Sequence, residues 1–440
     1  MNVYVGIDLG STTTKAVVID DKEKVLGRGI TNSRSNYLAA CAVAKTEALI
    51  DTRLSQLRVA MDGSSAHLLA LLERHFRLEQ YLDQLARLER TIFGVVGSLP
   101  GDAAARRIVL GKLFEGMREE APALIVSGQR KSDFFRDIAG SSYHTIGERL
   151  ADPRTVPLDH LMGFFDRCII TVENEIPEMG FAAYARPALQ RTLAASTMSE
   201  SEKTRVATAL AEIIDRDIVE VASVGTGYGR QRLPFPKEQI RSEILCHGLG
   251  AHAMFPESAT VLDIGGQDTK AIQLDNQGVV TSFQMNDRCA AGCGRYLGYI
   301  ADEMNIGLHE LGPLALDAHK TVKINSTCTV FAGAELRERL SLGQRREDIL
   351  SGLHRAIMLR AMSLLARSGG IRDEFTFTGG VAKNPAAVKA LKGLVEENYG
   401  ARTLNISPES IYTGALGAAL YALRDVDKLG GRTDAHSSRN

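Results

Sequence analysis

The strongest constraint on the fold of this chain is a motif that occurs twice. Residues 8–15 read Asp-Leu-Gly-Ser-Thr-Thr-Thr-Lys, and residues 263–270 read Asp-Ile-Gly-Gly-Gln-Asp-Thr-Lys. Each copy lies between two short β-rich runs, and a polar turn follows the second run. Both copies are therefore predicted to be β-hairpins whose connecting loops carry the motif. Two such hairpins, so far apart in one chain, predict two related lobes that face one another.

The segment between the two motifs has a different, helical pattern. Leucines recur at helical spacing over 66–90, and 101–120 and 203–216 are also amphipathic. Ser199 and its neighbours provide N-cap candidates for the last of these helices. The predicted organisation is a first lobe from 1–49 and 201–260, a mainly helical insertion at 50–200, a second lobe at 261–410, a helix at 411–425 that packs back on the first lobe, and a polar tail at 426–440.

Composition excludes several classes of protein. Among 440 residues, 52 Lys plus Arg balance 53 Asp plus Glu, so no broad basic surface for nucleic acid is expected. No apolar run reaches the ~18 residues that would cross a bilayer, and the N-terminus has no basic region before an apolar stretch. We therefore expect no nucleic-acid or membrane partner, and a cytoplasmic location. In a reducing compartment the six cysteines are expected to be buried, catalytic or metal-binding.

The two repeated loops have the chemistry of a polyphosphate site. Gly, Ser and Thr leave backbone N–H groups accessible to phosphate, and Asp8 and Asp263, at strand ends, form a carboxylate pair suited to Mg²⁺. The chain has no Gly-x-x-x-x-Gly-Lys-Ser/Thr loop, which disfavours a P-loop NTPase. The predicted nucleotide-contacting residues are Gly10, Ser11, Thr12, Thr13, Thr14, Lys15, Gly265, Gly266, Asp268 and Lys270.

A late Gly379-Gly380 pair follows a predicted strand at 374–378 and extends the pattern. Two Asp-Gly hairpins with such a turn resemble the actin, Hsp70 and sugar-kinase superfamily. That resemblance implies an α/β, two-lobed, ribonuclease-H-like ATPase. The hairpins would hold the phosphates of ATP, and Gly379 and Gly380 would contact the adenosine. A sugar or small-acid kinase is the alternative within the superfamily.

Two cysteines stand in unusual segments. Cys289 lies in Met-Asn-Asp-Arg-Cys-Ala-Ala-Gly-Cys-Gly-Arg and Cys328 in Asn-Ser-Thr-Cys-Thr-Val-Phe, each just before a predicted helix. A helix N-terminus stabilises a thiolate, which suits a reactive thiol or an iron–sulfur ligand. A cubane takes four thiolates, so two per chain would require a second subunit. Buried thiols and a zinc site remain alternatives. Cys293 has an undecided role, and packing is expected for Cys41, Cys168 and Cys246.

The order of these motifs carries a more specific resemblance. Asp-Ile-Gly-Gly-Gln-Asp-Thr-Lys is followed by the Cys289 segment, the Cys328 segment and Thr-Gly-Gly-Val-Ala-Lys-Asn at 378–384. Ser242-Glu243-Ile244 with Cys246-His247 also matches, as does Gly414-Ala415-Leu416-Gly417. This series resembles the iron–sulfur ATPase family of benzoyl-CoA reductase ATPase subunits and 2-hydroxyacyl-CoA dehydratase activators. The resemblance covers about 1–45 and 203–424.

The resemblance implies a mechanism and partners. Cys289 and Cys328 would ligate half of a [4Fe–4S] cluster shared with a second, homologous ATPase subunit, with reduced ferredoxin as the electron donor. Asp8 and Asp263 would be catalytic, with Gln267 orienting the attacking water. The helical insertion resembles the larger ATPase subunit of class I benzoyl-CoA reductase, which implies two further iron–sulfur subunits that reduce the substrate. An activator of a 2-hydroxyacyl-CoA dehydratase is the alternative.

Overall fold

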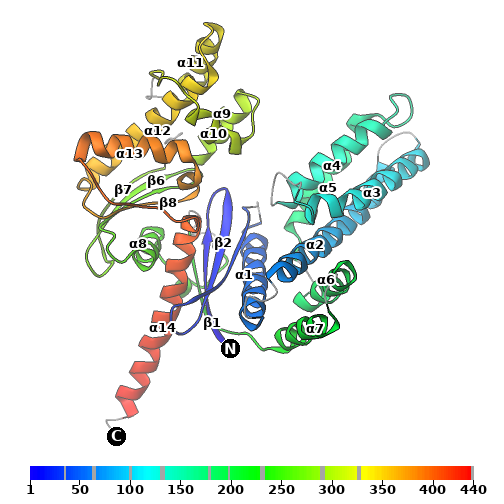
Figure 1. Cartoon of the computed structure of the whole chain (residues 1–440), viewed down its shortest axis with the longest axis horizontal. Helices are drawn as coiled ribbons and strands as arrows, with labels where there is room; N and C mark the ends of the chain where they lie inside the picture. Colours follow the sequence, from blue (N-terminus) through cyan, green and yellow to red (C-terminus); the bar gives the residue numbers. More distant parts are fainter. Residues whose placement is uncertain are drawn as a thin grey trace. The chain divides into compact units, whose positions relative to one another are not determined.

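The computed structural model divides the chain into two compact units (Figure 1). One unit contains Met1 and residues 34–218, and the other contains residues 2–33 and 219–440. The structure describes residues 1–33, 36–61, 66–98, 102–128, 134–176, 180–196, 199–227, 233–287, 293–324 and 329–437.

The larger unit contains two sheets, and the first is built on the N-terminal hairpin. β1 (Asn2–Leu9) and β2 (Thr13–Ile19) pair antiparallel, with Asp8 opposite Lys15. β3 (Val25–Asn32) continues the sheet beside β2, and β4 (Val219–Gly227) pairs parallel with β1. The strand order is β3-β2-β1-β4. The first predicted hairpin is thereby confirmed.

The second sheet repeats this arrangement. β5 (Thr260–Ile264) and β6 (Thr269–Leu274) form the second predicted hairpin, and Asp263 lies opposite Lys270. β7 (Val280–Asn286) pairs antiparallel with β6, while β8 (Phe375–Thr378) pairs parallel with β5. β9 (Leu404–Asn405) adds a fifth strand in the order β7-β6-β5-β8-β9. The sequence repeat thus corresponds to a repeat of sheet topology.

Two helices pack on the first sheet, and one of them also reaches the second. α14 (Thr413–Ser437) packs on β1 and β4, and α8 (Glu243–Met254) packs between α14 and the strands of the second sheet. The 3-10 turns Lys237–Gln239 and Ser410–Tyr412 precede these helices. α8 and α14 approach so closely that a Cβ on Gly417 would lie 1.8 Å from the Cys246 carbonyl oxygen. α14 continues to Ser437, beyond the predicted end of this helix.

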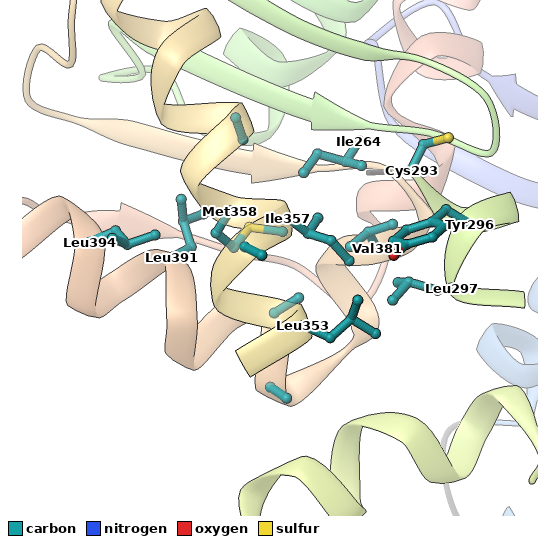
Figure 2. Close-up of a cluster of buried hydrophobic side chains, with 14 of the residues drawn as sticks. Ile264, Cys293, Tyr296, Leu297, Leu353, Ile357, Met358, Val381, Leu391 and Leu394 are labelled. Carbon is teal, nitrogen blue, oxygen red and sulfur yellow. The ribbon is translucent and has the colours of Figure 1, made fainter. Parts of the chain in front are cut away.

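The other face of the second sheet carries the largest apolar core of this unit. The helices are α9 (Gly294–Glu303), α10 (Leu311–Leu316), α11 (Thr329–Ser341), α12 (Arg346–Ser368) and α13 (Pro385–Tyr399), with short 3-10 turns at Leu308–Glu310 and Gly380–Lys383. Figure 2 shows part of this core. Among the described helices, only α12 has the length and apolar composition of a membrane span, and 67% of that stretch is buried, as in a core helix.

The smaller unit is helical. It contains α1 (Tyr37–Ala60), α2 (Ala66–Val95), the 3-10 turn Val96–Ser98, α3 (Ala103–Ile125), α4 (Phe135–Leu150), α5 (Leu158–Asn174), α6 (Phe181–Ala195) and α7 (Glu200–Asp215). Ser199 caps α7 in a capping box with Glu202, as its position predicts. The unit is wider than the expected insertion at 50–200, because α1 packs against α7 and shares an apolar core with it.

Candidate functional site

The first repeated loop is short and places its lysine beside its aspartate. Only Gly10, Ser11 and Thr12 lie between β1 and β2, because Thr13 and Thr14 already belong to β2. Lys15 Nζ lies 3.4 Å from Asp8 Oδ2, and their side chains are 12% and 4% exposed. The Thr14 side chain is buried and its hydroxyl lies 3.0 Å from the Ser33 hydroxyl. Thr14 therefore contributes to the sheet more than to an open loop.

The second loop has the same register but a different electrostatic environment. Lys270 Nζ lies 2.8 Å from Asp268, 2.9 Å from Glu243 and 3.4 Å from Asp263, and its side chain is 1% exposed. An ammonium group has three donors, so three carboxylates satisfy it. Lys270 is thus enclosed by protein carboxylates, whereas Lys15 is paired with one carboxylate and is partly accessible.

The two loops meet, as the sequence predicts. A Cβ built on Gly266 would lie 2.1 Å from Thr12 Oγ1 and 3.3 Å from Ser11 Oγ, so glycine is needed where the loops touch. Gln267 lies half-buried in the second loop. The arrangement brings together the backbone N–H groups, hydroxyls and carboxylates that a polyphosphate–metal site requires.

Two further residues of this site, Glu243 and His247, were not assigned a role by the sequence analysis. They stand four residues apart on α8, so they share one face of the helix. His247 Nδ1 lies 3.3 Å from Asp263 Oδ1, and Glu243 pairs with Lys270. Asp8, Glu243 and His247 each offer a ligand atom, and these atoms lie within 4.8 Å of one another. The Glu-x-x-x-His spacing in the chain was the signal that could have identified them.

The ionisation states follow from burial and from these pairs. Burial opposes the charge on Asp263, but His247 and Lys270 hold its pKa well below the usual range. Burial likewise opposes the charge on Lys270, yet the carboxylates of Asp263, Glu243 and Asp268 raise its pKa. The pKa of His247 is raised because the negative charge of Asp263 outweighs burial. For Glu243, burial raises the pKa and Lys270 opposes this effect.

The Gly379-Gly380 turn is positioned by the second sheet. β8 ends at Thr378, whose hydroxyl donates to Asp263 Oδ1 at 2.8 Å. Gly379 has φ +87°, and a Cβ there would lie 2.3 Å from the Ile264 carbonyl oxygen, so glycine is required. Gly380 has open space around its Cβ position among the described residues. The turn therefore begins directly beside the Asp263 carboxylate.

Both predicted cluster ligands, Cys289 and Cys328, lie outside the described residues. α11 begins at Thr329, directly after Cys328, as predicted, whereas α9 begins at Gly294, directly after Cys293. The two helices run parallel, since Tyr299 lies against Gly333 and Glu303 pairs with Arg337 four residues further along both helices. This pairing places the first turn of α9 level with the first turn of α11.

The second repeated loop is hydrogen-bonded to the start of α9. The Gly294 N–H donates to the Gly265 carbonyl at 2.9 Å, and the Arg295 N–H donates to the Gly266 carbonyl at 2.8 Å. Figure 2 shows Cys293 at the edge of the apolar core, near Ile264 and Tyr296. Burial raises the pKa of Cys293, which is typical of an unreactive thiol.

The remaining described cysteines are buried as predicted. Cys41, Cys168 and Cys246 are buried in the interior. Burial raises the pKa of Cys246 to about 12 and also raises that of Cys168. Their environments are those of packing residues.

A divalent cation fits the described residues. The chemistry of the donor set is suitable, and Asp8 Oδ1 is buried with no hydrogen-bond partner in the part of the chain that the structure describes. An unpaired buried carboxylate oxygen is costly, and a cation or its water would satisfy it.

The chain is similar in sequence to known proteins. Over 206 residues the chain is 43% identical to the (R)-2-hydroxyglutaryl-CoA dehydratase activating ATPase of Acidaminococcus fermentans, a match that covers 47% of this chain and 76% of that protein. Over 214 residues it is 34% identical to a benzoyl-CoA reductase subunit of Thauera aromatica, a match that covers 48% of this chain and 74% of that protein.

Solved structures share the fold. The crystal structure of (R)-2-hydroxyglutaryl-CoA dehydratase component A from Acidaminococcus fermentans aligns over 97% of this chain and 99% of that chain, with a TM-score of 0.51 and 24% identity. The activator of the 2-hydroxyisocaproyl-CoA dehydratase from Clostridium difficile with bound ADPNP aligns over 98% and 97%, with a TM-score of 0.52 and 21% identity. The predicted α/β, two-lobed fold is confirmed.

The family assignment rests on nearly the whole chain. Residues 5–422 match the BadF/BadG/BcrA/BcrD ATPase family, and this span includes both hairpins, α8 and the Gly379-Gly380 turn. The chain is a member of the BadF/BadG/BcrA/BcrD ATPase family.

Proposed function

We infer that this protein hydrolyses ATP and couples hydrolysis to electron transfer through an iron–sulfur cluster to a partner protein. The observation that carries this proposal is the meeting of the two Asp-Gly loops at Thr12 and Gly266, with Asp8 and Asp263 at the adjoining strand ends. Family membership supports the ATPase activity.

The site residues have the following proposed roles. Asp8 and Asp263 are the catalytic carboxylates that hold Mg²⁺ or its waters, and Gln267 orients the attacking water. The backbone of the two loops contacts the phosphates, with Lys15 as the accessible cation. The Gly379-Gly380 turn contacts the adenosine. For Lys270, the three surrounding carboxylates favour a role in holding Asp263 over direct contact with phosphate.

Electron transfer would depend on Cys289 and Cys328, which we propose as two ligands of a [4Fe–4S] cluster shared with a second ATPase subunit. Such a cluster supplies one-electron chemistry. The parallel pairing of α9 and α11 supports the proposal, because it places the first turns of both helices at the same end of the pair. The bonds from Gly294 and Arg295 to the phosphate loop would couple nucleotide binding to this end.

We consider two candidate partner proteins for the electron transfer. The 43% identity to a dehydratase activating ATPase, against 34% to a benzoyl-CoA reductase subunit, favours an activator of a 2-hydroxyacyl-CoA dehydratase. The helical unit favours the alternative, the ATPase subunit of benzoyl-CoA reductase in permanent association with two ring-reducing iron–sulfur subunits, because a permanent interface requires a large surface. In both cases we propose reduced ferredoxin as the donor and a cytoplasmic location.

Site variants and metal analysis test the proposal. Asp8→Asn and Asp263→Asn should each abolish ATP hydrolysis while the protein stays folded by circular dichroism. Full activity in either variant would remove that residue from the catalytic site. Anaerobically purified protein should contain iron and sulfide that Cys289→Ser and Cys328→Ser each lose, and an iron-free wild-type protein would exclude the cluster.

Co-purification from the native host decides between the two partners. A free homodimer would support the activator, and a stable complex with three other subunits would support the reductase.

A further inference from the structure

The strongest unassigned feature of the molecule is the group formed by Asp8, Glu243 and His247. Asp8 comes from β1, whereas Glu243 and His247 come from one face of α8, and the three side chains are 4%, 12% and 7% exposed. Their ligand atoms lie within 4.8 Å of one another. A hexacoordinate ion with bonds of about 2.1 Å places its ligands about 3 to 4 Å apart, so a small contraction would close the group around a cation.

Two independent observations indicate that this group is built around an occupant. Asp8 Oδ1 is buried with no hydrogen-bond partner among the described residues. In addition, a Cβ on Gly414 would lie 2.7 Å from His247 Nε2 and 3.1 Å from Asp8 Oδ2. Gly414 stands in the first turn of α14, and its missing side chain leaves space beside both of these side chains.

The surrounding charges favour a dication once its ligands are deprotonated. Four carboxylates are linked in this network (Asp8, Glu243, Asp263 and Asp268), while the ammonium groups among its described members are those of Lys15 and Lys270. Metal ligands bind in their deprotonated forms, and with Glu243 ionised and His247 neutral the network carries two negative charges in a largely buried position. Buried charge of one sign is costly, and a single divalent cation would neutralise it.

We propose that Asp8, Glu243 and His247 form a divalent-cation site with one imidazole ligand, which binds first-row transition-metal ions such as Mn²⁺ more tightly than Mg²⁺. Mg²⁺ prefers oxygen ligands and keeps its waters, whereas imidazole nitrogen suits transition metals. The inference rests on the proposed ATP site, because Asp8 belongs to both. It adds the cation's nitrogen ligand and the resulting metal preference.

Electron paramagnetic resonance tests the coordination directly. Wild-type protein grown with [¹⁵N]histidine is titrated with Mn²⁺ in the absence of nucleotide, and electron spin echo modulation is recorded. We expect Mn²⁺ to bind with a ¹⁵N coupling from histidine, and excess Mg²⁺ to compete weakly. Absence of bound Mn²⁺, or bound Mn²⁺ without a histidine coupling, would overturn the inference.

Two histidine variants test whether the ¹⁵N coupling to Mn²⁺ comes from His247. His247→Asn should remove the histidine coupling and weaken Mn²⁺ binding by at least about 10-fold, the lower range for loss of a residue that supports a metal site. His252→Asn, on the same helix but outside the group, should leave both unchanged. Retention of the coupling in His247→Asn would refute the assignment.

Gly414→Ala provides a second variant, since its methyl group would occupy the space beside His247 Nε2. Mn²⁺ affinity should fall in Gly414→Ala. It should be unchanged in Gly393→Ala, where a Cβ meets no atom within 4 Å among the described residues.

The Mn²⁺ experiment and the ATPase assay can each fail without the other. If the protein fails to hydrolyse ATP but Mn²⁺ shows the histidine coupling, the cation site stands and the ATPase proposal falls. If ATP is hydrolysed but bound Mn²⁺ shows no histidine coupling, the ATPase proposal stands and the cation site falls.

Discussion

The lysines at the same motif position in the two hairpins have different surroundings. Lys15 and Lys270 stand at the same register position in the two hairpins. Among the residues that the structure describes, Lys15 pairs with Asp8, while α8 brings Glu243 to Lys270, which also meets Asp263 and Asp268. The difference arises from the helix that packs there, which no inspection of the motif reveals.

Replacing the two lysines should separate stability from nucleotide binding. Lys270→Met leaves buried carboxylates without their shared cation, which should lower the free energy of unfolding by about 3–5 kcal/mol. Lys15→Met should cost less stability, because Lys15 is partly exposed, but should weaken ATP binding. Urea unfolding and isothermal titration calorimetry measure the two effects. A stable Lys270→Met protein that fails to bind ATP would instead make Lys270 a phosphate ligand, as the sequence motif suggests.

His354 should make the stability of the larger unit depend on pH. It is buried beneath α13, with Nδ1 2.7 Å from the Leu350 carbonyl and Nε2 3.0 Å from Asn384 Nδ2. Burial lowers its pKa, so the unfolded chain binds the proton more readily than the folded one. The free energy of unfolding should therefore decrease as the pH falls below the unfolded histidine pKa of about 6.5, until the folded pKa is reached.

Thermal unfolding between pH 7.5 and 5 measures this slope. His354→Gln should flatten it, since glutamine keeps hydrogen-bonding capacity without a titrating ring. The exposed His144 provides the control, and His144→Gln should keep the wild-type slope. An unchanged slope in His354→Gln would assign the pH dependence to another group.

At the scale of elements, the internal repeat extends further than the two hairpins. Gly227 ends β4 with φ +123° and lies against Leu9, and Gly379 follows β8 with φ +87° and lies against Ile264. A Cβ at either glycine would lie 2.3 Å from the carbonyl oxygen of the opposed residue. Thr226-Gly227 and Thr378-Gly379 are thus equivalent positions at the carboxyl ends of β4 and β8. Their motifs alone are too short to show this equivalence.

The start of α9 should respond to nucleotide through its bond to the phosphate loop. Arg295→Pro removes the N–H that donates to Gly266, and proline is tolerated in the first turn of a helix. One hydrogen bond contributes about 1 kcal/mol, so the coupling should fall by roughly five-fold. Hydrogen exchange of the remaining α9 amides, with and without ADPNP, measures the change.

A matched substitution controls for the effect of proline itself. Arg346→Pro, at the first position of α12, should leave the response of α9 to nucleotide intact. An undiminished nucleotide response in Arg295→Pro would exclude this route of coupling.

For the whole molecule, the chain divides into two compact units, and each contains apolar clusters of its own. Two such clusters are formed by residues of the helical unit, and three others by residues of the larger unit, in the part of the chain that the structure describes. Each unit should therefore retain its own stabilising core when the other is absent.

Deleting residues 34–218 should leave a folded ATPase. β3 and β4 lie at opposite edges of the sheet, and both run parallel to β1. A connection from the end of β3 to the start of β4 must therefore cross three strand spacings and return along one strand length, a straight-line distance of about 33 Å. A Gly/Ser linker of about 35 residues has this mean end-to-end distance. ATP hydrolysis should persist with a cooperative unfolding transition, while association with the native partner should be lost.

Steady-state ATPase assays and pull-downs against the full-length protein measure the two outcomes. A deletion variant that folds but retains its partner would show that the helical unit is not the contact surface.

The sequence alone determined the two hairpins, their facing loops, the helical segment and several helix starts, because these depend on local patterns and on a motif that occurs twice. Ser199 as the α7 cap and Thr329 as the first residue of α11 are examples. Tertiary structure decided the rest. It extended the helical unit to 34–218, placed Cys293 before α9 and enclosed Lys270. It also brought Glu243 and His247 to Asp8, because contacts between distant segments depend on how α8 packs between two sheets, which the Glu-x-x-x-His spacing by itself does not specify.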